Sequence, residues 1–155
     1  MKLKTLLVLL LAGAALAGCH RLDPNSPEYK RQAVFKEMLK TSEDMGGMLR
    51  GRIPFDADKF RANSTKLGEL ADKPWQYFPT TQPPADKVES DDTRAKAEIW
   101  QRQLEFQADA KTFEQAVRAL GDNTRNAAPT PEGVRKDFAA VEDACEACHK
   151  KFRAL

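Results

Sequence analysis

One segment near the C-terminus decides the fold: Val134-Arg135-Lys136-Asp137-Phe138-Ala139-Ala140-Val141-Glu142-Asp143-Ala144-Cys145-Glu146-Ala147-Cys148-His149-Lys150-Lys151-Phe152. Its apolar residues and both of its cysteines recur in steps of three and four: Val134, Phe138, Val141, Cys145, Cys148 and Phe152. That period is typical of an α-helix with one apolar face. The segment therefore predicts a helix, opened by Thr130 and Pro131, whose two cysteines lie on the inward side.

The end of this segment has the C-x-x-C-H spacing of covalent c-type haem attachment. Because residues three apart share one face of a helix, the thiols of Cys145 and Cys148 can both reach one porphyrin edge and add to its two vinyl groups. His149 follows directly, where its imidazole can ligate the iron. The sequence therefore predicts one haem c, held by the two cysteines, with His149 as the axial iron ligand.

Two other chemistries use a C-x-x-C pair. A redox dithiol of the thioredoxin type needs a βαβ pattern, which this chain lacks. A zinc site needs two more nitrogen or sulfur ligands, and the remaining candidates are Cys19 and His20, far away in the sequence. His20 fits a polar tether better than a ligand set, so haem attachment is the favoured interpretation.

Three further segments repeat in steps of three and four. The first is capped by Ser26 and ends before Gly51, the second starts after Asp56, and the third begins near 91–92 and is closed by Gly121. Their expected core positions are Phe35, Met38, Ser42, Met45 and Leu49; Ala57, Phe60, Ser64, Leu67 and Ala71; and Ile99, Gln103, Phe106, Ala110, Phe113, Val117 and Leu120. No segment alternates with period two over a useful length. The predicted fold class is all-α, an antiparallel four-helix bundle with haem c on the C-terminal helix.

The N-terminus has the pattern of a lipoprotein signal peptide over residues 1–18. Lys2 and Lys4 precede a short apolar run, and Leu16-Ala17-Gly18 supplies small residues before Cys19. Cleavage there would leave Cys19 as a lipid attachment site, with residues 19–26 as a tether and residues 27–155 as the bundle. Two or more acyl chains would give stable anchoring. An ordinary signal peptide cut nearby is the alternative.

Charge gives no evidence for a polyanionic partner. The net charge of +2 comes from Lys2 and Lys4, since the rest of the chain balances basic and acidic residues. Neither a nucleic-acid footprint nor a phosphate loop, H-E-x-x-H or G-x-S-x-G motif is present. We therefore expect no nucleic-acid binding, and a gas-binding or electron-transfer protein rather than an enzyme.

From about residue 27 to 155 the chain resembles the cytochrome c′ family. The resemblance rests on Tyr29-Lys30-Arg31-Gln32, Gly51-Arg52-Ile53-Pro54-Phe55-Asp56, Pro74-Trp75 with Phe78, Glu98-Ile99-Trp100, and Cys145-Glu146-Ala147-Cys148-His149-Lys150-Lys151-Phe152-Arg153. It implies that His149 is the proximal iron ligand, with Arg153 beside that imidazole and Arg31 near the haem propionates. Trp75 and Trp100 are either haem-wall or core residues, and Trp100 is the one expected to contact the haem.

Phe35 matches the family position that faces the distal side of the iron. Low-spin members place an iron-ligating methionine there, and phenylalanine has no lone pair to donate. The resemblance therefore implies a five-coordinate, high-spin iron. Met38, one turn further along, would become the sixth ligand if this register were shifted.

Three functions follow from these alternatives. The favoured one is binding of nitric oxide or another small gas, for scavenging and tolerance, in the bacterial cell envelope. There the lipid would anchor the protein on the periplasmic side, at the outer membrane. The alternative is a membrane-anchored periplasmic electron carrier with a six-coordinate haem and an unknown electron donor. A haem peroxidase is disfavoured because no distal His or Arg acid–base pair is apparent near Phe35. Family members commonly pair through their first two helices, which implies a homodimer.

Overall fold

The computed structural model describes residues 22–83 and 93–154 of the chain. Its helices are α2 (Pro27–Leu49), α3 (Ala57–Leu70), the 3₁₀ helix η1 (Trp75–Tyr77), α5 (Glu98–Gln101), α6 (Gln103–Asn126) and α7 (Pro131–Phe152). Cys19 and the expected signal peptide lie outside the described residues. Within the described ranges, no helix combines the length and apolarity that a membrane crossing requires.

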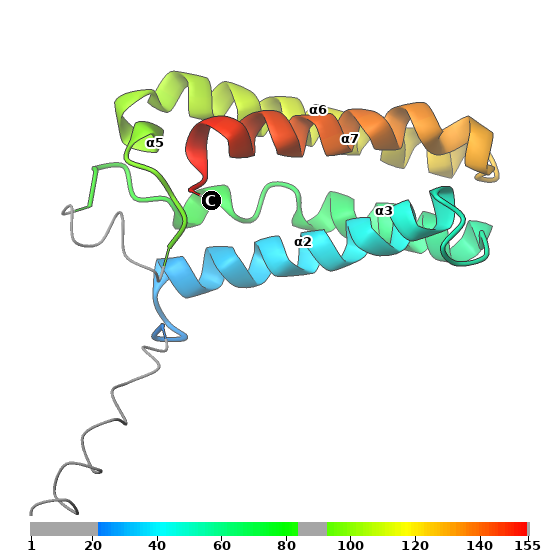
Figure 1. Cartoon of the computed structure of the whole chain (residues 1–155), viewed down its shortest axis with the longest axis horizontal. Helices are drawn as coiled ribbons and strands as arrows, with labels where there is room; N and C mark the ends of the chain where they lie inside the picture. Colours follow the sequence, from blue (N-terminus) through cyan, green and yellow to red (C-terminus); the bar gives the residue numbers. More distant parts are fainter. Residues whose placement is uncertain (1–21, 84–92, 155) are drawn as a thin grey trace, which may run out of the picture.

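The four long helices form an antiparallel bundle (Figure 1). Short turns join α2 to α3 and α6 to α7, so each pair runs in opposite directions, while the long segment between α3 and α6 carries η1 and α5. Contacts between α2 and α3, α3 and α6, α6 and α7, and α2 and α7 close the four helices around one core. The predicted fold class is confirmed.

Side-chain caps begin three of these helices. Ser26 Oγ accepts a hydrogen bond from the Tyr29 amide at 3.1 Å, Asp56 Oδ1 from Lys59 at 2.9 Å, and Thr130 Oγ1 from Gly133 at 3.1 Å. Each satisfies an amide that has no partner within its helix, which is worth about 1 kcal/mol. The predicted starts of the first, second and fourth helices are therefore confirmed.

The third helix differs from its prediction at both ends. Its expected start at 91–92 lies outside the described residues, but 93–97 are not helical, and the helical region is interrupted at Arg102 (φ −123°, ψ 46°). Gly121 does not close it, because α6 continues to Asn126. The reason is packing: Thr124, one turn later, is buried and its hydroxyl bonds Ser64 Oγ at 3.2 Å, so the inward face extends beyond the glycine.

The predicted core position of Gln103 is also wrong. Gln103 is exposed, since it is the first residue after the interruption at Arg102, and the buried face of α6 begins with Phe106. The sevenfold series Ile99, Phe106, Phe113 and Leu120 is buried as expected. A regular repeat thus located the buried face but not the break within it.

The buried side chains form two clusters. The larger one, the main cluster, runs along the bundle and comprises Met38, Met45, Met48, Leu49, Phe60, Leu67, Leu70, Ala71, Phe113, Val117, Leu120, Val134, Phe138, Val141 and Ala144. The smaller one, the end cluster, is formed by Ile99, Phe106 and Phe152. Trp75 of η1 packs against both clusters and so joins them.

Candidate haem site

The inward face of α7 carries Cys145 and Cys148 to the place where the two clusters meet. Cys145 packs against the main cluster and Cys148 against the end cluster, and both thiols are free and half-buried. Burial raises the pKa of each thiol to about 11, helped by the negative charge of Glu142 at Cys145 and of Asp109 at Cys148. The helix thus presents two protonated thiols, one turn apart, on one side.

His149 follows these thiols near the end of α7. Loss of solvation and, second, the positive charge of Arg153 lower the pKa of its imidazole, although the residue as a whole is exposed. Both causes favour the neutral ring, which is the form that ligates a metal. The carbonyl of His149 accepts a hydrogen bond from the Arg153 amide at 3.0 Å.

Trp75 lies at the centre of an aromatic group beside the cysteines. Its ring meets those of Phe35, Phe106 and Phe113 edge to face, with centroids 5.8, 5.9 and 6.4 Å apart. The indole Nε1 is buried and has no hydrogen-bond partner within residues 22–83 and 93–154, which is rare for a buried donor in a protein. An aromatic wall with an unsatisfied donor, next to a C-x-x-C-H pair, fits a flat aromatic macrocycle with polar substituents, so the residues present fit haem c.

Arg31 brings a buried positive charge to the same end of the bundle. It is 4% exposed; its Nη2 donates to Thr93 Oγ1 at 2.7 Å and its Nη1 to the Tyr77 carbonyl at 3.3 Å. The guanidinium lies over the Phe78 ring at 4.9 Å, and Phe78 packs on Phe106. Burial lowers the pKa of Arg31, and Glu28, 3.6 Å away, opposes this.

Phe35 is half-buried and packs against the main cluster, as Cys145 does. Met38 is more deeply buried, at 6% exposure, and belongs to the same cluster. Trp100 packs against the end cluster, as Cys148 does, and its Nε1 donates to the Pro79 carbonyl at 3.0 Å. Phe35 and Cys145 therefore share the main cluster, Trp100 and Cys148 share the end cluster, and Arg31 reaches the end cluster through Phe78.

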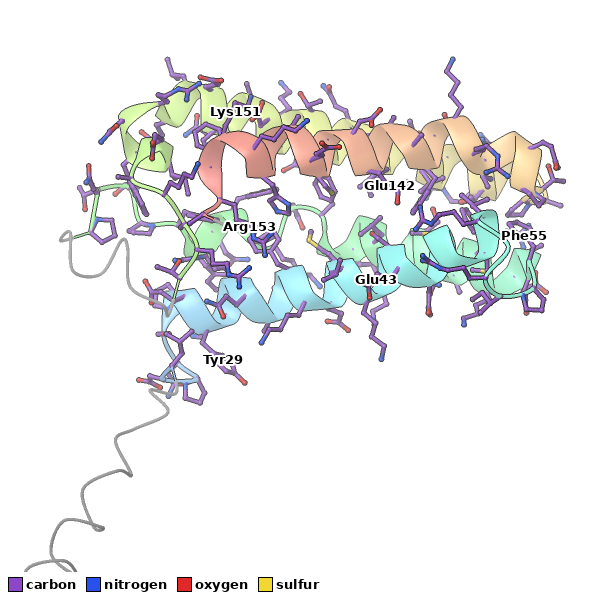
Figure 2. All side chains as sticks on the ribbon, in the orientation of Figure 1. Tyr29, Glu43, Phe55, Glu142, Lys151 and Arg153 are labelled. Carbon is purple, nitrogen blue, oxygen red and sulfur yellow. The ribbon has the colours of Figure 1, made fainter. Side chains whose placement is uncertain are left out.

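Arg153 lies beyond the end of α7, in extended backbone. It is at the same end of the bundle as Tyr29, whereas Phe55 marks the other end (Figure 2). Ala95 pairs with Arg153 in an isolated antiparallel bridge. This bridge has no sequence signature, because single pairs formed by residues far apart leave no period in the chain.

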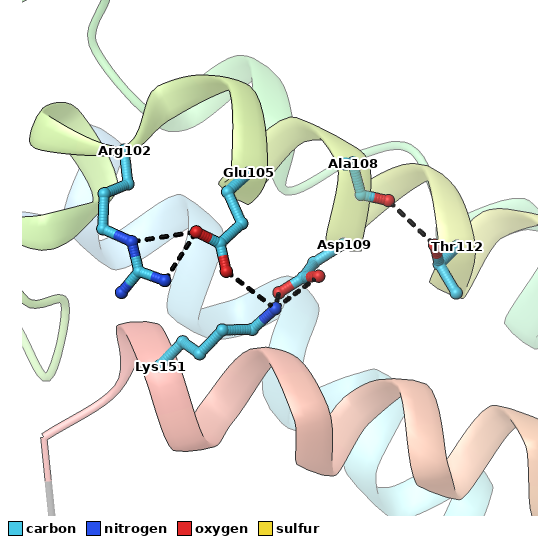
Figure 3. A network of polar contacts seen from close by, with 6 residues as sticks. All are labelled: Arg102, Glu105, Ala108, Asp109, Thr112 and Lys151. Carbon is cyan, nitrogen blue, oxygen red and sulfur yellow. Dashed lines mark hydrogen bonds and ion pairs between the residues drawn. The ribbon is translucent and has the colours of Figure 1, made fainter.

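A polar network fastens the last turn of α7 to α6 (Figure 3). Lys151 Nζ donates to Asp109 Oδ1 at 2.7 Å, lies 2.6 Å from Oδ2, and is 3.3 Å from Glu105 Oε1. Glu105 in turn accepts from Arg102 Nε at 2.9 Å. Sequence analysis missed this network and the central position of Trp75. The Pro74-Trp75 and Phe78 pattern indicated that Trp75 belongs to the site, but not that it is more central there than Trp100.

An antiparallel four-helix bundle with a C-x-x-C-H pair on the inward face of its last helix defines the class of bundle-type c cytochromes. Comparison with known proteins agrees. The family model described as Cytochrome C′ matches residues 28–153. Cytochrome c′ of Halomonas halodenitrificans is 30% identical over 134 residues, which are 85% of this chain and 98% of that protein. The chain belongs to the cytochrome c′ family, and its cofactor is a single covalently attached haem c.

Solved structures show the same relationship. Cytochrome c′ from Shewanella frigidimarina superposes with a TM-score of 0.74 at 27% identity, covering 87% of this chain and 99% of that one. A nitric oxide complex of a leucine-to-alanine variant of cytochrome c′ from Alcaligenes xylosoxidans superposes with a TM-score of 0.70 at 25% identity, covering 84% and 98%.

Proposed function

We propose that this protein binds nitric oxide, or a similarly small uncharged gas, at a five-coordinate haem iron in the bacterial envelope, for scavenging and tolerance. When bound, haem c supplies an iron atom with one axial position open to such a gas. The observation that supports the proposal is Phe35: this hydrocarbon side chain packs on the cluster that Cys145 touches. The resemblance puts it at the position where low-spin members of the family carry an iron-ligating methionine.

The residues have separate tasks in this proposal. Cys145 and Cys148 hold the macrocycle, and the neutral imidazole of His149 is the single protein ligand. Phe35, which packs edge to face against Trp75, fills space and excludes water without offering a lone pair or a proton. Nitric oxide needs no hydrogen-bond donor to bind ferrous haem, whereas bound dioxygen benefits from one. A nitric oxide complex is known for a relative of 25% identity, which supports this choice of gas.

The test is an optical spectrum of the reduced holoprotein with and without nitric oxide. We expect the reduced wild type to be high-spin and its spectrum to change when the gas is added. Phe35→Met should become low-spin and bind gas more slowly, because its thioether would reach the iron. Phe35→Ala should instead speed entry of carbon monoxide and nitric oxide. Phe113→Met is the matched control, since Phe113 also packs on Trp75 but lies on α6. Low-spin reduced wild type would contradict the proposal.

One observation favours the alternative of an electron carrier. Met38 is 6% exposed and lies in the cluster that Cys145 contacts, so a thioether is available one turn from Phe35. If the reduced wild type is low-spin and Met38→Leu abolishes that state, Met38 is the sixth ligand. The electron donor would then be the partner to identify.

We also propose an anchor and a pairing surface. Lipid on Cys19 would hold the bundle at the outer membrane, facing the periplasm.

A homodimer through α2 and α3 is supported by Leu39, which is 58% exposed on α2. Sedimentation of the wild type and of Leu39→Glu tests the pairing: a dimer should become a monomer in the variant, and a monomeric wild type would refute it.

A further inference from the structure

We propose that residues 93–96, here called the strap, couple the buried Arg31 to the backbone of Arg153, and that Thr93 is the positioning residue of this coupling. The inference rests on the proposed function and on the places that the resemblance implies for the two arginines at the haem. It adds that one segment sets the positions of both arginines. Among the described residues, this segment makes no hydrogen bond to Cys145, Cys148 or His149.

The strap begins at a single hydroxyl group. Thr93 Oγ1 accepts from Arg31 Nη2 at 2.7 Å and from the amide of Ala95 at 3.2 Å. Thr93 is 6% exposed and Arg31 4%, so neither bond is readily replaced by water. A hydroxyl oxygen has two lone pairs, and here both are used. The hydroxyl therefore connects the guanidinium of α2 directly to the strap backbone.

The strap ends on the residue that follows α7. The Ala154 amide donates to the Arg94 carbonyl at 2.8 Å, and the Lys96 amide donates to the Phe152 carbonyl at 3.0 Å. These bonds flank the Ala95–Arg153 pair on both sides, which makes it a non-hydrogen-bonded antiparallel pair. Directly opposed side chains in such a pair project from the same face. Ala95 packs on the end cluster, and the Arg153 opposite it is exposed.

Without the strap, Arg153 would have little to fix it. The helix ends at Phe152, and Arg153 is extended at φ −117° and ψ 130°. The bond from its amide to the His149 carbonyl at 3.0 Å restrains the nitrogen but not the torsion that directs the next peptide. The two hydrogen bonds that flank the bridge supply that restraint. Removing the Thr93 hydroxyl should therefore make the backbone at Arg153 more mobile, although no hydrogen bond of the described residues joins Thr93 to Arg153 directly.

The experiment uses the full-length holoprotein with two pairs of variants. Thr93→Val removes the hydroxyl at nearly constant shape, and Thr93→Ser keeps it. Ala154→Pro removes the bridging N–H, which the extended conformation of the preceding Arg153 tolerates, and Ala154→Ser keeps it. Amide hydrogen exchange at Lys96 and Ala154 should accelerate at least about fivefold in Thr93→Val, as expected for one lost hydrogen bond, and stay near wild type in Thr93→Ser.

A second readout separates positioning from mere structural support. The iron–histidine stretching band of the ferrous protein should shift or broaden in Thr93→Val and in Ala154→Pro, and in neither serine variant. In an Arg153→Ala background, Thr93→Val should cause no further change of the band. Accelerated exchange with an unmoved band would overturn the positioning role, and unchanged exchange at Ala154 would overturn the coupling itself.

The outcome remains distinct from that of the gas-binding proposal. A six-coordinate, low-spin wild type would reject the proposed function, and the exchange rates of the Thr93 pair would still decide whether the strap couples the two ends. If Thr93→Val does not fold, the Ala154 pair decides, because it leaves the buried hydroxyl in place. If the wild type is five-coordinate, but neither the amide exchange nor the iron–histidine band changes in the Thr93 or the Ala154 variants, only the strap proposal is rejected.

Discussion

Arg31 places a buried guanidinium over the Phe78 ring, and among the described residues its one ion-pair partner is Glu28 at 3.6 Å. Its closer partners are neutral: the Thr93 hydroxyl and the Tyr77 carbonyl. Buried charge is destabilising unless it is paired, and part of that penalty is offset by these bonds and by the Phe78 face. A carboxylate from the haem would complete the pairing, which is the role that the resemblance implies for Arg31.

Arg31→Lys should therefore destabilise the protein although charge is kept. An ammonium lacks the planar fork that reaches Thr93 and Tyr77 at once, and hydrogen bonds from charged groups are worth about 1.5–3 kcal/mol each. We expect a loss of about 2 kcal/mol in the free energy of unfolding, measured by denaturant titration of the holoprotein. Arg125→Lys, on the exposed surface, is the control and should stay within about 0.5 kcal/mol. Equal stability of the two variants would show that the fork contributes nothing.

At the scale of helices, glycine has opposite roles at two positions. Gly51, after the end of α2, has φ 70°, a conformation that other residues avoid. Gly121 was expected to end the third helix but lies inside α6. A Cβ at Gly121 would meet Arg125 Nη1 at 3.1 Å, the far end of a flexible and exposed side chain. The same residue type is thus required at one site and replaceable at the other.

Gly121→Ala should stabilise the protein by about 0.5–1 kcal/mol, because alanine loses less backbone entropy in a helix and Arg125 can move aside. Gly51→Ala should destabilise it by about 1–2 kcal/mol through the left-handed conformation. Thermal unfolding of both variants measures the contrast. A destabilising Gly121→Ala would mean that Arg125 cannot shift, or that the inward face of α6 is more crowded than the contacts indicate.

The network of Lys151, Asp109 and Glu105 contributes at the scale of a helix pair. Asp109→Asn should lower the free energy of unfolding by about 1 kcal/mol, since an ion pair becomes a neutral contact. The hydrogen bond to Asp109 is the first cause that raises the pKa of Lys151 above its ordinary 10.5. The stabilisation is therefore complete below pH 10.5 and is lost as pH rises through the raised value.

Thermal melts of wild type and Asp109→Asn between neutral pH and pH 11 measure this contribution. Their difference should be constant at neutral pH and shrink at the alkaline end. Asp122→Asn is the matched control, because Asp122 pairs with Arg125 at an exposed site of the same helix. A wild-type advantage that stays unchanged up to pH 11 would show that the Lys151 charge is not its source.

How well the sequence predicted each feature depends on how far apart in the chain the interacting residues lie. Helix caps such as Ser26 and Thr130 act over three residues, so they were predicted correctly. The site residues Cys145 and His149 lie four positions apart in one motif. By contrast, Arg31 meets Thr93 across 62 positions and Tyr77 across 46, and neither contact leaves a periodic pattern. The interruption at Arg102 and the rank of Trp75 were missed for the same reason, since both depend on tertiary packing.

At the scale of the whole molecule, the candidate site occupies one end of the bundle. It draws on α2, η1, the strap, α6 and α7, while the opposite end is closed by the two short turns (Figure 1). The candidate site residues of the described chain, from Arg31 to Arg153, all lie in the bundle and the strap. A lipid tether at Cys19 can therefore set the location of the protein without altering its site.

Cys19→Ser should release the protein from the membrane fraction or stall its processing, with the reduced haem spectrum of the folded product unchanged. Mass spectrometry of wild type from native membranes should show an acylated N-terminal cysteine. Ser26→Thr, a conservative change at the first helix cap, serves as a control for handling and should remain membrane-bound. An unmodified mature N-terminus in the wild type would reject the anchor.

The indole of Trp75, which has no hydrogen-bond partner in the described part of the chain, also gives an optical signal for haem attachment. An indole enclosed by hydrocarbon emits at short wavelength, and its emission is extinguished by energy transfer when a strongly absorbing pigment lies against it. Trp100, whose nitrogen bonds Pro79, provides a second emitter with a more polar surrounding. In a Trp100→Phe background the remaining fluorescence should therefore fall as haem becomes attached, so that loading could be followed in real time by light alone.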